Sequence, residues 1–103
     1  MTATEMQALL GKGLTVTSMD LKGGKEFTSR VNLAADGKIS GALTVSGQQP
    51  VAFTGAWKLK GAQLCRNLVP IQPEEVCETW LKSGNKEVTV QVGGKDVSMN
   101  RWQ

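Results

Sequence analysis

Residues 51–60 read VAFTGAWKLK, and apolar and polar residues alternate along them with a period of two. The apolar set, taken as the inward face, is Val51, Phe53, Gly55, Trp57 and Leu59. Such alternation is typical of an antiparallel strand with one buried and one solvated face. Gly61 and Ala62 then turn the chain into the next run, which holds Cys65. The stretch therefore predicts two neighbouring strands of an antiparallel sheet, with Trp57 in the core.

Short runs of the same kind recur from residue 14 to residue 102, separated by turns such as the hairpin-forming pair Asp36-Gly37. Their spacing, about 8–12 residues, predicts about eight strands. Successive hairpins make an antiparallel meander, and an all-β meander of this size can close into a small barrel without exposed edges. Between two of these strands, residues 69–73 (VPIQP) are expected to form a semi-rigid loop, because each proline fixes its own φ.

The N-terminal residues carry the signals of a short helix. Thr2 and Glu5 have the spacing of a capping box. An apolar stripe at helical spacing follows, formed by Met6, Leu9 and Leu10. Because glycine at position 11 suits a helix C-terminus, we expect a helix over residues 3–10 that packs on the sheet.

Size and composition indicate one soluble globular domain covering residues 1–103. Hydrophobic residues make up 40% of the chain and charged residues 20%, which is ordinary for a folded domain of this length. No stretch approaches the ~20 apolar residues that span a bilayer. Met1 leads directly into Thr2-Ala3-Thr4-Glu5, so we expect no signal peptide in this chain. The protein is then either cytoplasmic or secreted with its signal removed.

The charge pattern argues against nucleic-acid binding. The net charge is only +3, and the chain contains no tyrosine. Binders of nucleic acid usually interleave dense Lys/Arg clusters with stacking aromatic rings. We therefore expect no nucleic-acid partner.

The chain has two cysteines and no histidine. A zinc site normally needs four nitrogen or sulfur ligands, and Cys65 and Cys77 do not form a CxxC redox motif. We expect them to form a structural disulfide, which places the protein in an oxidising compartment, periplasmic or secreted. The alternative is a cytoplasmic protein with two reduced, buried cysteines.

Catalytic motifs are missing from the sequence. Without histidine no Ser-His-Asp triad is possible, and the glycine turn at Lys22–Lys25 precedes no helix that could hold a phosphate. Glu74, Glu75 and Glu78 are expected to form a solvated rim instead of an acid–base pair. We therefore expect no enzyme, no cofactor and no metal.

One surface stands out as a binding candidate. The loop at 69–73 presents Val69 and Ile71 on a stiff backbone, next to Arg66, Glu74 and Trp80. Apolar anchors inside a polar rim suit a protein or small apolar partner. The alternative for Ile71 is a lid residue that packs on the barrel. For Trp80 and Trp102 two roles are open: packing in the core or at the rim, and stacking on a ligand.

The pattern Gly55-x-Trp57-x-Leu59-x-Gly61-x-x-Leu64-Cys65, followed by Cys77 and Gly84, resembles small uncharacterised cell-envelope proteins of alphaproteobacteria. More distantly, the chain resembles the disulfide-containing β-barrel lysozyme inhibitors of the bacterial periplasm. Their Ser-Gly-Tyr inhibitory loop has no counterpart, because this chain lacks tyrosine. The resemblance implies a secreted β-rich domain and carries no catalytic residue over.

The sequence thus predicts a monomeric, non-enzymatic binding module of the cell envelope that takes a protein or a small apolar ligand at one barrel end. The alternatives are a structural or accessory domain without a ligand, and a hydrolase-inhibitor-like protein.

Overall fold

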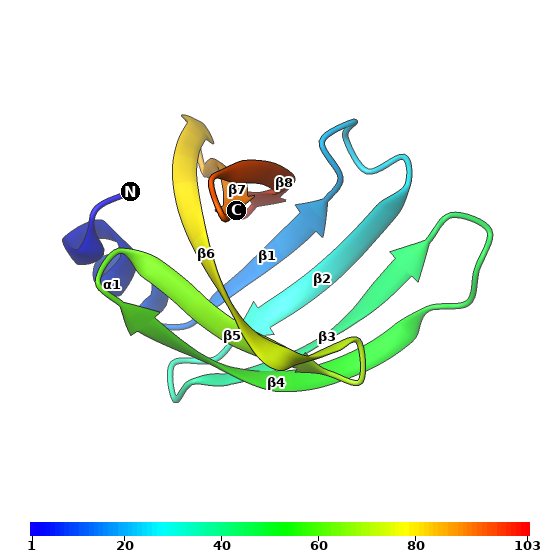
Figure 1. The fold of residues 1–103 in the computed structure, drawn as a ribbon, viewed down its shortest axis with the longest axis horizontal. Helices are drawn as coiled ribbons and strands as arrows, with labels where there is room; N and C mark the ends of the chain where they lie inside the picture. Colours follow the sequence, from blue (N-terminus) through cyan, green and yellow to red (C-terminus); the bar gives the residue numbers. More distant parts are fainter.

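The computed structural model describes residues 1–103 as a closed eight-stranded antiparallel β-barrel with one short helix at one end (Figure 1). The elements in chain order are α1 (Ala3–Leu10), β1 (Leu14–Met19), β2 (Phe27–Leu33), β3 (Lys38–Val45), β4 (Val51–Lys60), β5 (Gln63–Val69), β6 (Gln72–Gly84), β7 (Glu87–Val92) and β8 (Lys95–Arg101). Each strand pairs with the next, and β1 pairs with β8 to close the barrel. The predicted meander with an N-terminal helix is confirmed.

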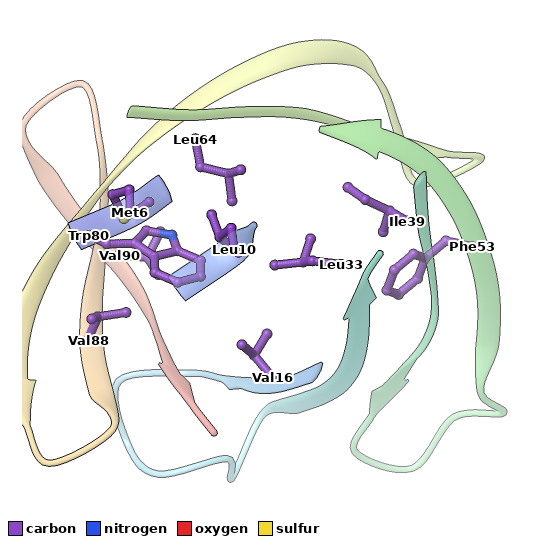
Figure 2. Close-up of a cluster of buried hydrophobic side chains, with 10 residues drawn as sticks. All are labelled: Met6, Leu10, Val16, Leu33, Ile39, Phe53, Leu64, Trp80, Val88 and Val90. Atoms are coloured by element: carbon purple, nitrogen blue, oxygen red, sulfur yellow. The ribbon is translucent and has the colours of Figure 1, made fainter. Parts of the chain in front are cut away.

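The helix plugs one end of the barrel. The predicted capping box is present: the Glu5 backbone N–H donates to Thr2 Oγ1 at 3.1 Å, and the Thr2 N–H donates to Glu5 Oε1 at 3.0 Å. Met6 and Leu10 of α1 point into the barrel beside Trp80 and Val90, and both helix side chains are fully buried (Figure 2). The helix, eight residues long, falls well short of what crossing a bilayer requires.

The inward face predicted for residues 51–60 is correct over most of β4. Phe53 is buried, and Trp57 is half-buried against the core, where its Nε1–H donates to the Ala34 carbonyl oxygen at 2.9 Å. Val51 differs, because it is the first residue of β4 and reaches the end of the barrel, where it stays exposed.

The two inward-facing glycines, Gly41 and Gly55, allow neighbouring groups to approach the strands closely. A Cβ at Gly41 would lie 2.1 Å from the Arg30 carbonyl oxygen and 2.8 Å from the Phe53 ring, so this glycine makes room for both. At Gly55 a Cβ would lie 1.9 Å from the Asn67 carbonyl oxygen of the neighbouring strand. The glycine therefore accommodates the backbone of the neighbouring strand.

The loop predicted at residues 69–73 is a tight turn. Strand β5 ends at Val69 and β6 begins at Gln72, so only Pro70 and Ile71 lie between them. Pro73 falls inside β6, between the ladder pairs at Gln72 and Val76, where the β5–β6 register shifts. Because Pro73 has no ladder partner on β5, its missing N–H does not interrupt the hydrogen bonds between the two strands.

The loop between β1 and β2 is organised by one carboxylate that the sequence did not single out. Asp20 is buried, and its side chain accepts hydrogen bonds from the backbone N–H groups of Lys22, Gly24, Glu26 and Phe27. Burial alone would raise the pKa of Asp20, but these four donors outweigh it and lower the pKa to about 2.

We expect Asp20→Asn to destabilise the protein at neutral pH and to make little difference in strong acid. The folded pKa of Asp20 lies below its ordinary value of 3.8, so the ionised carboxylate stabilises the native state above that value. This contribution is lost as the pH falls from about 4 to about 2. The urea midpoints of the wild type and of Asp20→Asn, measured across this pH range, test this prediction. A difference that stays constant down to the lowest pH would contradict it.

Candidate binding site at the open end of the barrel

The barrel interior is divided into three layers along its axis. Near α1 lies the apolar core, which contains Leu33, Leu64 and Trp80. Polar side chains from five strands follow in the middle: Ser18, Ser29, Arg66, Glu78, Ser98 and Asn100. Beyond this polar belt, apolar side chains line the end opposite α1. We call these two parts the polar belt and the mouth.

An ion pair forms the centre of the polar belt. Arg66 Nη2 and Nε both lie 3.2 Å from Glu78 Oε2, and Trp80 Nε1–H donates to Glu78 Oε1 at 2.8 Å. The Glu78 side chain is 7% exposed and that of Arg66 19%. Arg66 Nη1 also donates to Gln72 Oε1. Glu78 is therefore compensated in charge and accepts a hydrogen bond on each oxygen.

Asn100 carries the one fully buried side-chain atom of the polar belt that lacks a hydrogen-bond partner. The residue is 5% exposed, and its Oδ1 has no hydrogen-bond partner. No other buried side-chain nitrogen or oxygen in the chain is left without a partner. Because an unpaired buried acceptor is costly, this atom marks a place where a bound group with a donor would stabilise the protein.

Two adjoining pockets occupy the polar belt and the mouth. The inner one, about 80 Å³, is lined by Asn100, Glu78 and Trp80 among others. The mouth holds a pocket of about 470 Å³, within the range of about 300–1,000 Å³ that small-molecule sites occupy. Both parts share Ser18, Ser29, Arg66, Leu68 and Ser98 as lining residues. The apolar lining of the mouth comprises Phe27, Leu43, Val45, Phe53, Leu68, Ile71 and Val97.

The exposed large apolar side chains also gather at this end of the barrel. The loops from β1 to β2, β3 to β4, β5 to β6 and β7 to β8 all lie opposite α1, as the course of the first three strand pairs shows in Figure 1. On these loops or the adjoining strand ends lie Leu21, Val51, Val69, Ile71 and Val97, each at least 40% exposed. Leu81, on the wall near α1, is the exception. The open end is thus lined mostly by apolar side chains, and its rim combines exposed apolar residues with exposed charged ones such as Lys22, Lys25 and Lys95.

The structure separates the predicted binding surface into an inner and an outer part. Arg66 and Trp80 face the barrel interior, and Trp80, at 1% exposed, belongs to the core and not to a surface rim. Val69, Ile71 and Glu74 are exposed at the open end. Of these, Ile71 lines the mouth and Val69 does not. Trp102 stacks on Trp80 at a centroid distance of 6.1 Å and packs on the core.

The expectation of a solvated glutamate rim is wrong for one of its three members. Glu78 is buried, whereas Glu74 and Glu75 are exposed. Glu75 pairs with Lys60 at 2.8 Å on the outer wall. The signal for Glu78 was its spacing, since it lies two residues from both Val76 and Trp80 and shares their face of β6.

The predicted disulfide joins Cys65 of β5 to Cys77 of β6. The two residues are directly opposite in the ladder, with Cα atoms 3.9 Å apart. They lie on the opposite face of their strands from Arg66 and Glu78. The disulfide therefore cross-links two neighbouring strands of the barrel wall and does not line the cavity.

No family model, curated protein or solved structure matches this chain. The resemblance to envelope proteins and lysozyme inhibitors stays a prediction. The function is therefore inferred from the interior of the barrel.

Proposed function

We propose that this protein is a non-enzymatic binding module of the cell envelope that holds a small apolar ligand in the open end of its barrel. The observation that carries the proposal is the pocket of about 470 Å³ at the mouth, lined by apolar side chains from several strands. A closed barrel with one end plugged by a helix gives such a pocket rigid walls and a single entrance.

The compartment is part of the proposal and is supported by the disulfide. Disulfides persist in the periplasm and outside the cell, whereas thiols are kept reduced in the cytosol. The pair Cys65–Cys77 is therefore in keeping with a periplasmic or secreted protein.

We expect the double variant Ile71→Ser, Val97→Ser to bind apolar ligands about tenfold more weakly than the wild type. Both side chains line the mouth and are at least 40% exposed, so their loss removes ligand contacts without opening the core. Each buried methylene contributes about 0.8 kcal/mol, and about 1.4 kcal/mol is tenfold in affinity. The dissociation constant is measured by titrating the protein into the neutral dye N-phenyl-1-naphthylamine, whose fluorescence rises in apolar surroundings.

The matched control is Val51→Ser, Val69→Ser. These side chains are equally exposed at the same end of the barrel but do not line the pocket. Their loss should leave dye binding unchanged. Equal weakening by both double variants points to a partner bound on the outer rim, as a protein partner would be. A dye that shows no saturable binding to the wild type contradicts the proposal.

A further inference from the structure

We infer that the ligand, given the proposed function, is a single-chain amphiphile with an uncharged head group that donates a hydrogen bond, such as an alcohol or a primary amide. The head enters first and reaches the polar belt at Asn100, while the chain lies along the apolar mouth. The inference rests on the order of the layers, on the charge of the belt and on one unpaired atom.

The order of the layers sets the direction of binding. The two pockets share three serines and Arg66, and the smaller, inner one adds the polar side chains of Glu78 and Asn100 among its apolar lining residues. A purely apolar ligand would leave Asn100 Oδ1 without a partner. An amphiphile that enters with its head first meets polar groups at depth and apolar groups along its chain.

The charge of the polar belt selects an uncharged head. Arg66 and Glu78 are the charged groups that line the inner cavity, and they form an ion pair with each other. A carboxylate head would bring a second negative charge next to Glu78, and an ammonium head a second positive charge next to Arg66. Burying either head without a free counter-ion is unfavourable.

The hydrogen-bonding pattern selects a donor. Both Glu78 oxygens already accept hydrogen bonds, so they offer little to a new donor. Asn100 lines the same cavity, and its Oδ1 is buried without a partner. A hydroxyl or amide N–H donates to that oxygen, and the nearby serine hydroxyls both donate and accept.

The test compares ligands of one chain length against the dye described above. In displacement titrations at neutral pH, 1-decanol and decanamide should compete about tenfold or more strongly than decanoate and decylammonium, because only the last two carry charge. If decanoate or decylammonium competes as well as decanol, the inference fails while the proposed function stands. If neither the dye nor any of the four compounds binds, the proposed function fails.

The variant Asn100→Leu should bind decanol about three- to tenfold more weakly than the wild type, which is the effect of losing one hydrogen bond. Dye binding, which depends on the mouth, should stay as in the wild type. A parallel loss of dye and decanol affinity would assign Asn100 a purely structural role and overturn its part in head-group recognition.

A measurement on the unaltered protein tests the orientation. Trp80 lines the inner cavity and does not line the mouth. Decanol brominated at carbon 2 should therefore quench the tryptophan emission more than decanol brominated at carbon 10, because bromine quenches an indole only at contact. The reverse order would show that the chain enters first and would overturn the inference.

Discussion

Replacing Trp80 with alanine should lower the free energy of unfolding by about 3–5 kcal/mol, the range found for large aromatic side chains removed from cores. Trp80 is 1% exposed, stacks on Trp102 and donates to Glu78. Its loss leaves a cavity and removes one of the hydrogen bonds that satisfy a buried carboxylate. Urea denaturation followed by far-UV circular dichroism gives the value.

The variant Trp80→Phe serves as the control, because it keeps an aromatic ring in the core and removes the N–H donor. It should fall between the wild type and Trp80→Ala. An alanine variant whose midpoint equals that of the wild type would contradict the packing of the barrel around this indole.

Removing the disulfide should cost about 3 kcal/mol. The two cysteines are 12 positions apart in the sequence. Closing a loop of this size lowers the entropy of the unfolded chain, which stabilises the folded protein by about 3 kcal/mol. The double variant Cys65→Ala, Cys77→Ala tests it against the wild type in urea. A wild type measured with a reductant provides the control, because it removes the bond without removing the sulfur atoms.

Equal stability of the double variant, the reduced protein and the oxidised protein would contradict the prediction. Protein isolated from its native compartment with two alkylatable thiols would instead contradict the oxidising location.

The fold could be predicted because its signals are local. A capping box followed by an apolar stripe defines α1, and glycine turns such as Asp36-Gly37 define hairpins whose strands alternate with a period of two. Each hairpin fixes its own register, so a chain of hairpins makes a meander. The disulfide followed from the number of cysteines and from the lack of histidine.

The binding site could not be predicted in the same way, because the closed barrel turns polar residues inward. Arg66 and Glu78 read as surface charges when each strand is taken alone, and they become compatible with the interior only as a pair across two strands. On β8, the polar Ser98 and Asn100 line the inner cavity, whereas the apolar Val97 reaches only the exposed edge of the mouth. Alternation of hydrophobicity points to the wrong face of such a strand.

Asp20 shows a second reason why the sequence is insufficient. Its four backbone donors come from the loop between β1 and β2, and they converge only when that loop is folded. A single aspartate before a glycine-rich turn carries no signal of this, since short polar residues are common at turns.

The most direct test of the central claim, that the open end of the barrel is a ligand site, is a map of amide chemical shifts in the ¹⁵N-labelled protein titrated with 1-decanol. The account predicts saturable shifts at Leu43, Leu68 and Val97 of the mouth and at the side-chain amide of Asn100, with α1 unchanged. Shifts confined to α1 or to the outer wall around the disulfide, or no shifts up to the solubility of decanol, would contradict it.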